Sequence, residues 1–524
     1  MGVSDIFASL KGVLPGNSSY RYSAIPAPAS SQAHRTQRRV DERDRPTRLF
    51  KLSAGGMVLS AILVAAVVYG CVHLLLTRLA LTNRPRRQSS SSPSRGCQVS
   101  GQCTCISSHT WGQYSPFFSA PSAIDASTPA GCELTFALVL SRHGSRFPTA
   151  AKTEAYRSLI ARIQGSVMHY GAGYEFIRDY AFDLGADQLT TYGENEMVDS
   201  GAAFFQRYEK LGKDSDPFIR ASGSDRVIMS AQNFTHGFYG AQGKSGAGQS
   251  AKILVIPEGA GFNNTLDHGG CPAFEHGPAS HLGPEKQATW RAAWATPIMK
   301  RLNSKLPGAN LTLKETVFVM DLCPFNTVAT PNTTKSDFCR LFSQDEWRGY
   351  DYFESLEKWY RYGRGNPLGP TQGAGYANEM IARLTGKAVE DHTSTNSTLD
   401  SSPKTFPLDR KLYADFSHDN SMTSVYAALG LYNKTDDLPV THKLSPYRTH
   451  GYSASWTVPF AGRMYVEKMR CGKGEEELVR ILVNDRVVSL HGCGADELGR
   501  CKLGDFVASL SFARAGGLWD TCFT

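Results

Sequence analysis

The chain has 524 residues, of which 41 % are hydrophobic and 20 % are charged. This composition excludes a wholly disordered chain and a membrane protein with many spans, and the length suffices for a large folded core. The net charge of +8 is concentrated near the N-terminus: residues 1–51 hold nine Lys and Arg against four acidic residues, and residues 77–96 hold five Arg and no acid. Residues 97–524 therefore carry a net charge of −2, and we expect no nucleic-acid partner.

Between the two basic segments lies an uncharged apolar stretch of 22 residues, Gly55–Leu76. At about 1.5 Å per residue it can cross a hydrocarbon core of roughly 30 Å, and it is longer than the apolar run of a cleaved signal peptide. We therefore predict a disordered cytosolic tail at 1–54, one transmembrane helix at 55–77 and a flexible stalk at 78–96. Membrane attachment through this helix is one of the expected partnerships.

The distribution of cysteines and glycosylation motifs predicts where the folded body resides. Eleven of the twelve cysteines, and six N-x-S/T sites, follow the apolar stretch, which is typical of an oxidising compartment. We expect a single-pass membrane protein whose C-terminal body is lumenal or extracellular, with release by proteolysis in the stalk left open. We expect the protein to be a monomer.

Residues 97–524 alternate between strand-like and helix-like patterns. Short apolar runs predict buried strands at 133–141, 251–257 and 316–323, helical spacing predicts helices at 195–210 and 345–362, and two apolar runs within 478–493 predict a hairpin. Strands that alternate with helices favour an α/β fold.

The most informative motif directly follows the first predicted strand. There Arg142 and Arg146 flank His143, and Gly144 permits close backbone approach. In open α/β sheets ligands gather beyond the carboxyl ends of strands, and two guanidinium groups so close together suit an oxyanion such as phosphate. We also expect these positive charges to keep the imidazole of His143 neutral, because they disfavour imidazolium.

Two further stretches complete a candidate phosphate site. His418 and Asp419 follow another short apolar run, and a carboxylic acid there supplies the proton donor that phosphoester cleavage needs. Arg226 follows a Gly/Ser turn after a third short run. Taken alone, the His-Asp pair is common and a weak signal, and the stretch that carries Arg226 is equally typical of the start of a surface helix.

The two histidine motifs, RHGSRFP at 142–148 and SHDN at 417–420, together resemble the signature pair of the histidine acid phosphatases. Further stretches make the sequence similar to the fungal phytases of that family: WGQYSPFF (111–118), RASGSDRVIMSAQNF (220–234), NNTLD (263–267) and GNPLGPTQGAGYANEMIARLTG (365–386). The likeness covers residues 97–524 and leaves out the tail, the apolar stretch and the stalk.

This resemblance implies a catalytic body at 97–524 with a definite architecture. It consists of a large α/β domain, with a mixed sheet and helices on both faces, and a smaller, mainly helical domain inserted in its middle part. Four disulfide bonds are implied: Cys132–Cys471, Cys271–Cys522, Cys323–Cys339 and Cys493–Cys501. Cys97 would pair with Cys103 or Cys105. The resemblance implies no metal ion and no other cofactor.

The resemblance also implies roles for individual residues. His143 would attack phosphorus and form a phosphohistidine, and Asp419 would protonate the leaving alcohol as general acid, so we expect an acidic working pH. The phosphoryl oxygens are expected to be held by Arg142, Arg146, Arg226 and His418. The substrate pocket is expected to be lined by Gln113, Tyr114, Lys152 and Lys358.

The leading substrate expectation is phytate, myo-inositol hexakisphosphate. Beside Lys152 and Lys358 the chain has Glu154 and Glu357 where the family's phytate binders often have additional lysines. Fewer cations weaken the binding of a highly charged substrate, so a broad-specificity membrane-anchored acid phosphatase is the alternative. A catalytically silent surface glycoprotein is a third hypothesis, disfavoured because all six candidate catalytic and phosphate-binding residues are present.

Overall fold

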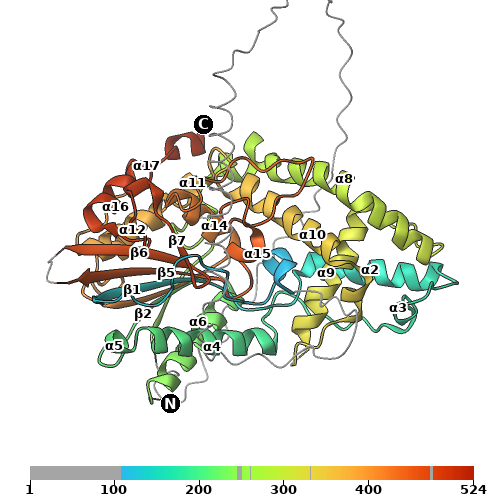
Figure 1. The fold of residues 1–524 in the computed structure, drawn as a ribbon, viewed down its shortest axis with the longest axis horizontal. Coiled ribbons are helices and arrows are strands. Elements are labelled where there is room, and N and C mark those ends of the chain that lie inside the picture. The colour runs from blue at the N-terminus through green and yellow to red at the C-terminus, as the bar shows by residue number, and fades with distance from the viewer. Residues whose placement is uncertain (1–107, 245–250, 260, 331, 473–475) are drawn as a thin grey trace, which may run out of the picture. The chain divides into compact units, whose positions relative to one another are not determined.

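The computed structural model describes residues 108–524 apart from 245–250, 260, 331 and 473–475. Its strands form one mixed sheet in the order β3-β2-β4-β1-β5-β6-β7, with β8 paired to β6 (Figure 1). The strands are β1 (Cys132–Arg142), β2 (Phe218–Ser222), β3 (Ile253–Ile256), β4 (Leu412–Ser417), β5 (Arg463–Cys471), β6 (Glu477–Val483), β7 (Arg486–Val488) and β8 (Cys501–Lys502).

Many of the remaining described residues form helices. They are α2 (Ala150–Ser166), α3 (Phe176–Asp179), α4 (Thr191–Arg207), α5 (Glu209–Gly212), α6 (Asp225–Ala241), α7 (Pro272–His276), α8 (Leu282–Lys305), α9 (Leu313–Ala329), α10 (Gln344–Glu357), α11 (Gly369–Gln372), α12 (Ala374–Thr385), α13 (Ser397–Asp400), α14 (Asp419–Ala428), α15 (Ala454–Thr457), α16 (Leu503–Ser509) and α17 (Ser511–Arg514). A π-helical turn, η6 (Lys358–Tyr362), continues α10. The predicted α/β fold with a mixed sheet is confirmed.

The sheet has a parallel half and an antiparallel half. β3, β2, β4 and β1 are parallel neighbours, whereas β5, β6 and β7 continue from β1 in antiparallel order. Because parallel strands run in the same direction, the carboxyl ends of β1, β2, β3 and β4 meet at one edge of the sheet. The chain segments that leave these four ends therefore lie close together.

Helices cover both faces of the sheet, and β1 shows why. Successive side chains of a strand point to opposite faces. Ala137 and Val139 belong to a buried cluster with residues of α4 and α6, whereas Phe136, Leu138 and Leu140 belong to another with residues of α12 and α14. Figure 1 shows α4 and α6 below the strands and α12 and α16 above them. A strand buried on both faces reads as a continuous apolar run, as 133–141 does.

Between β3 and β4 the described residues form helices and turns, α7 to α13. This is the position of the predicted mainly helical insertion, but residues Cys97–Thr524 make one compact unit. A separate helical domain stays a prediction.

The strand predicted at 316–323 is wrong, because these residues lie inside α9. A capping box begins this helix: Thr312 accepts from the backbone of Glu315, whose side chain accepts from the backbone of Thr312. Residues on nearly all sides of α9 are buried, including Val317, Val319 and Met320. A helix buried on all sides has no polar stripe, so its apolar run cannot be told from a strand by periodicity.

The other strands and helices predicted within residues 108–524 are confirmed. The helix predicted at 195–210 is α4 followed by α5, and the one at 345–362 is α10 followed by its π-helical turn. The hairpin is β6 and β7, joined by Asn484 and Asp485, which both have positive φ. Such a two-residue turn matches the twist of paired strands.

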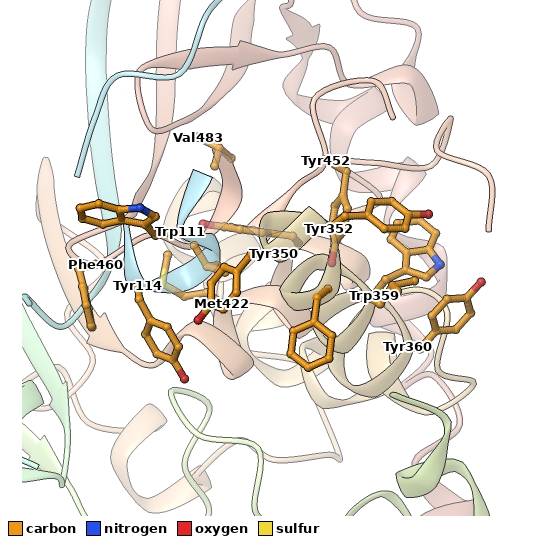
Figure 2. Packing of buried hydrophobic residues seen from close by; sticks show 14 of the residues in the cluster. Trp111, Tyr114, Tyr350, Tyr352, Trp359, Tyr360, Met422, Tyr452, Phe460 and Val483 are labelled. Atoms are coloured by element: carbon orange, nitrogen blue, oxygen red, sulfur yellow. The ribbon is translucent and has the colours of Figure 1, made fainter. Parts of the chain in front are cut away.

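A large aromatic cluster lies next to the sheet and reaches the edge where the parallel strands end. Figure 2 shows Tyr114 and Phe460 side by side at one end of this cluster, and their ring centroids are 6.0 Å apart. Phe460 is fully buried. Its ring therefore gives neighbouring charged side chains a fixed apolar surface to pack against.

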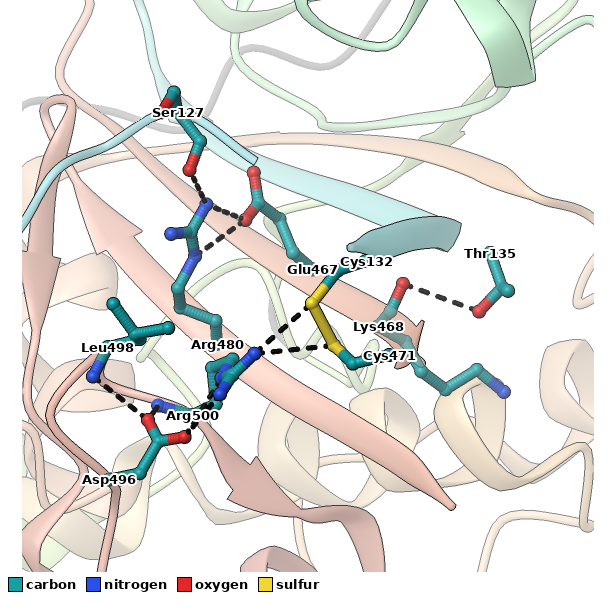
Figure 3. The surroundings of a disulfide bond; sticks show 10 residues. All are labelled: Ser127, Cys132, Thr135, Glu467, Lys468, Cys471, Arg480, Asp496, Leu498 and Arg500. Atoms are coloured by element: carbon teal, nitrogen blue, oxygen red, sulfur yellow. Dashed lines mark hydrogen bonds and ion pairs between the residues drawn. A yellow bond between two sulfur atoms is a disulfide. The ribbon is translucent and has the colours of Figure 1, made fainter. Parts of the chain in front are cut away.

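All four predicted disulfide bonds are present among the described residues: Cys132–Cys471, Cys271–Cys522, Cys323–Cys339 and Cys493–Cys501. Cys132 and Cys471 are direct partners in the β1–β5 ladder. Figure 3 shows that Arg500 donates to both sulfur atoms, at 3.1 and 3.3 Å, while Asp496 binds the same guanidinium. The predicted partner of Cys97 lies outside the described residues.

The predicted membrane localisation requires a correction. Across residues 108–524, leaving out their undescribed gaps, no helix is long and apolar enough to cross a bilayer. The longest, α8, carries several charged residues, among them Glu285 and Arg291, and a span needs about 20 mostly apolar residues. The helix proposed at 55–77, with the tail and stalk around it, lies outside the described residues. We therefore do not retain the prediction of a single-pass membrane protein.

Candidate active site

The carboxyl ends of the parallel strands bring the separate histidine and arginine motifs together. His143 follows β1, Arg226 is the second residue of α6 after β2, and His418 and Asp419 follow β4. The ring centroids of His143 and His418 are 5.7 Å apart, and Arg226 Nη2 lies 3.5 Å from His418 Nδ1. Asp419 Oδ2 lies 3.4 Å from Arg142 Nη2. Residues separated by up to 277 positions thus form one site.

His143 is arranged as a neutral nucleophile. Its Nδ1 lies 2.9 Å from the carbonyl oxygen of Gly144, which can only accept, so Nδ1 carries the proton and Nε2 keeps a lone pair. The residue is 1 % exposed. Burial, and then the charges of the neighbouring arginines, lower the pKa of His143 well below its ordinary value. The expected neutral imidazole agrees with this environment.

Three arginines surround the imidazole. The guanidinium of Arg142 lies 4.6 Å from the ring centre of Phe460, and that of Arg146 lies 6.0 Å from it. Burial lowers the pKa of Arg142 to about 10, so the group stays cationic at neutral and acidic pH. Arg142 Nη2, which lies 3.4 Å from Asp419 without a hydrogen bond to it, and the Nε atoms of Arg146 and Arg226 are buried donors with no hydrogen-bond partner among the described residues. Converging donors of this kind suit an oxyanion.

Asp419 differs from expectation in its protonation state. Its Oδ2 pairs with Lys358 Nζ at 3.0 Å as well as with Arg142. Burial by itself would raise the pKa of Asp419, but Arg142 and Lys358 lower it well below its ordinary value. The carboxyl group is therefore ionised in the free site at the acidic pH where it was expected to hold its proton.

The four expected pocket residues are placed near the site but are already engaged. Gln113 donates from Nε2 to Glu354 at 2.7 Å, and its backbone oxygen accepts from Arg142. Lys152 donates to Tyr114 Oη at 2.9 Å and pairs with Asp321. The side chain of Lys152 is 34 % exposed, whereas Gln113, Tyr114 and Lys358 are buried. Their contact with substrate stays a prediction.

Lys358 lies beside the candidate acid and away from solvent. It donates to Asn420 Oδ1 at 2.6 Å and contacts Asp419 and Glu357. The π-helical turn that begins at Lys358 directs its side chain toward the start of α14. Its charge acts directly on the ionisation of Asp419.

Two acidic residues at the site were missed by sequence reasoning. Glu258 follows β3 and lies 2.8 Å from His418 Nε2. Glu196 of α4 accepts from the backbone and side chain of Ser145, both at 2.9 Å, and from the backbone of Phe117. Glu258 could have been found, because it directly follows a run predicted as a strand; Glu196 has no comparable local signal.

Comparison with known proteins identifies the family to which the chain belongs. A model of the histidine phosphatase superfamily (branch 2) matches residues 133–484, which include His143, Arg226, His418 and Asp419. The chain therefore belongs to branch 2 of the histidine phosphatase superfamily.

Curated relatives narrow the similarity further. Phytase A of Aspergillus oryzae is 52 % identical over 448 residues, which are 84 % of this chain and 95 % of that protein. Phytase A of Emericella nidulans is 53 % identical, over 81 % of this chain and 92 % of that protein. Phytase A of Aspergillus fumigatus is 49 % identical, over 86 % of this chain and 99 % of that protein.

Solved structures share the fold. The phytase from D. castellii superimposes with a TM-score of 0.66 at 22 % identity, over 80 % of this chain and 88 % of that chain. A multiple inositol polyphosphate phosphatase from Bifidobacterium longum, in complex with inositol hexasulfate, gives a TM-score of 0.52 at 16 % identity, over 77 % of this chain and 97 % of that chain. At these identities the likeness concerns the fold alone.

Proposed function

We propose that the protein is a histidine acid phosphatase that hydrolyses phytate through a phosphohistidine intermediate. The observation that carries this proposal is the neutral, proton-free Nε2 of His143 among three guanidinium groups, with a carboxyl group at 419 beside them. Near 50 % identity to three Phytase A proteins over most of the chain supports phytate as the substrate.

The first step forms a bond between His143 Nε2 and phosphorus while the ester bond to the leaving oxygen breaks. The departing alkoxide takes a proton from Asp419, which balances the step. Arg142, Arg146 and Arg226 offset the negative charge of the phosphoryl oxygens as they pass through the transition state. In the second step the Asp419 carboxylate takes a proton from the water that attacks phosphorus, the bond from phosphorus to His143 breaks, and inorganic phosphate leaves with His143 Nε2 again free of a proton.

Asp419 must gain its proton in the complex with substrate, because it is ionised in the free site. A bound phosphate group places negative charge beside Arg142, which weakens the hold of that cation on the carboxylate. The pKa of Asp419 then rises from its depressed value. The general acid is therefore created by substrate binding.

The proposal is tested with the purified full-length protein at about pH 5. We expect phosphate release from phytate, and we expect His143→Ala to lower it by at least about 10³-fold, because the covalent route is lost. His169→Ala is the matched control, since His169 is exposed on the loop after α2, and it should retain full activity.

Two outcomes would overturn parts of the proposal. Hydrolysis of an aryl phosphate with little release from phytate would favour the broad-specificity acid phosphatase. The wild-type protein can also be incubated with a radioactive phosphate ester and quenched rapidly without acid. The absence of label bound to histidine would contradict the covalent intermediate.

A further inference from the structure

Glu258 is an acidic residue at the carboxyl ends of the parallel strands to which neither the sequence analysis nor the proposed mechanism gives a role. It is the second residue after the end of β3. Its Oε1 lies 2.8 Å from His418 Nε2 and 3.2 Å from the backbone nitrogen of Ser224. Ser224 immediately precedes α6, which carries Arg226. One carboxylate thus connects the segments that leave β2, β3 and β4.

This contact fixes which nitrogen of His418 can face the phosphate site. A carboxylate only accepts hydrogen bonds, so His418 Nε2 must carry a proton, and the ring cannot flip without losing this bond. The other nitrogen, Nδ1, is thereby directed toward Arg226 Nη2 at 3.5 Å. His143 faces the same ring, with 5.7 Å between the centroids.

The distance of 3.5 Å between His418 Nδ1 and Arg226 Nη2 is long for a direct hydrogen bond, and it allows both atoms to bind the same phosphoryl oxygen. Arg226 Nη2 can only donate. When a phosphoryl oxygen binds Arg226, an Nδ1 that also carries a proton can donate to the same oxygen. The imidazole is then a cation, and the carboxylate on its far nitrogen offsets that charge. The charged groups that contact the ring are Arg226 on α6 and Glu258 itself, and Asp419 is the next residue in the chain.

The carboxylate of Glu258 is ionised across the whole acidic range in which the reaction is expected. Burial by itself would raise its pKa, but the hydrogen bond and charge of His418, with donors from Ser222 and Ser224, lower the pKa of Glu258 to about 2. Its side chain is 25 % exposed. The group is therefore available as a fixed negative partner for the imidazole.

We propose that Glu258 is a positioning residue which, through His418, presents an Nδ1–H donor to the phosphoryl oxygen that Arg226 binds. This inference rests on the proposed phosphatase function and adds a residue to it. Glu258 does not touch the reacting atoms; it acts only through the ring of His418.

The test is a double-mutant cycle in the full-length protein. Glu258→Ala and Glu258→Gln are each made in the wild-type and the His418→Asn background, and binding of inorganic phosphate is measured by calorimetry. We expect Glu258→Ala to weaken phosphate binding about 10-fold with His418 present and to have no further effect with His418→Asn. Glu258→Gln keeps an acceptor oxygen but loses the charge that offsets the imidazolium, so its phosphate affinity should lie between those of wild type and Glu258→Ala.

A matched control comes from a second carboxylate–histidine pair of nearly the same geometry. Glu275 lies 2.7 Å from His268, and its side chain is 23 % exposed. Glu275→Ala should leave phosphate binding and turnover unchanged. With an aryl phosphate as substrate, Glu258→Ala should lower kcat as well as raise KM, because the donor also serves the transition state.

The outcomes separate this inference from the proposed function. Equal effects of Glu258→Ala in both backgrounds, or no effect in either, would overturn the role of Glu258 while leaving the phosphatase intact. A wild-type protein that cleaves no phosphomonoester would overturn the proposed function, whereas the coupling in phosphate binding would still support the contact between Glu258 and His418.

Discussion

The charge of Arg142 shifts the pKa of both central titratable groups in the same direction. Its charge lowers the pKa of His143, which keeps the nucleophile unprotonated, and it also lowers the pKa of Asp419, which keeps the acid ionised. The free site is therefore ready for attack but not for protonation of a leaving group. Binding of a phosphate group resolves this difference, because its negative charge offsets Arg142.

At the scale of the residue, Asp419→Asn tests this division of labour. We expect kcat on an alkyl phosphate to fall by about 100-fold or more, because the poor leaving group needs a proton, and kcat on an activated aryl phosphate to change much less. Steady-state kinetics on both esters measure the difference. Equal losses on the two esters would contradict the role of Asp419.

The same substitution carries its own control for folding and binding. Because the substitution removes a negative charge beside Arg142, the inhibition constant of inorganic phosphate should stay the same or fall. A clear weakening of phosphate inhibition would mean that Asp419→Asn had disturbed the phosphate site, and the kinetic result would then count against the proposed arrangement.

At the scale of elements, the loop after β1 is fixed by close packing against α4. A Cβ on Gly193 would lie 1.9 Å from the backbone oxygen of Ser145, and one on Gly144 would lie 2.4 Å from that of Gly193. Thr190 caps α4 by accepting from Gly193, and Glu196 accepts from Ser145. The start of α4 therefore positions the loop that carries the nucleophile.

Gly193→Ala should separate the loop from α4. We expect kcat to fall by at least about 10-fold, since small displacements of catalytic groups are costly, and thermal stability to decrease as well. Gly165→Ala is the control: it lies in α2 with no atom within 4 Å of the added Cβ, and alanine favours the helix by roughly 0.5–1 kcal/mol. Wild-type turnover in Gly193→Ala would refute this packing argument.

A buried ion cluster joins β2, β4 and α12 behind the site. Asp415 is fully buried and binds Arg220 at 2.9 and 3.0 Å and Arg383 at 2.6 Å. Burial opposes ionisation, yet these two arginines lower the pKa of Asp415 to about 2, from 3.8. Because the pKa of Asp415 is lower in the folded than in the unfolded protein, its ionisation stabilises the fold at pH values above the unfolded pKa. This stabilisation is lost as the pH falls toward 2.

We expect the free energy of unfolding to lose roughly 2 kcal/mol through Asp415 between pH 4 and pH 2. Asp415→Asn should abolish this part of the pH dependence, and at pH 6 it should destabilise the protein by about 3–5 kcal/mol, because it breaks a buried ion pair. Urea unfolding at several pH values measures both. Asp409→Asn, at an 86 % exposed side chain, should change neither.

At the scale of the whole molecule, disulfide bonds connect residues far apart in the sequence. Cys132–Cys471 joins β1 to β5 across 339 residues, whereas Cys493–Cys501 spans 8. In the chain-entropy account a longer closed loop restricts the unfolded chain more. Cys132→Ser with Cys471→Ser should therefore lower the free energy of unfolding on the order of 2–4 kcal/mol more than Cys493→Ser with Cys501→Ser. Denaturation of the two double variants tests this; equal losses would contradict the loop-length account.

The sequence by itself determined the ends of the strands and the motifs that follow them. His143, His418 and Asp419 could be placed because each follows a short apolar run, and such runs mark buried strands whose carboxyl ends meet. The four disulfide bonds followed from the resemblance of the sequence to a family. The failure at 316–323 has the same origin: a helix buried on all sides repeats the pattern of a buried strand.

Only the tertiary structure decided which side chains meet across those strand ends. Glu258 reaches His418 over 160 positions, and Lys358 reaches Asp419 over 61. The sequence can mark Glu258 as a residue that follows a predicted strand, but it cannot show either pairing, because strand order and the path of a π-helical turn decide which side chains meet. The protonation states followed in turn, since the pKa of a buried group depends on the charges that the fold places within a few ångströms.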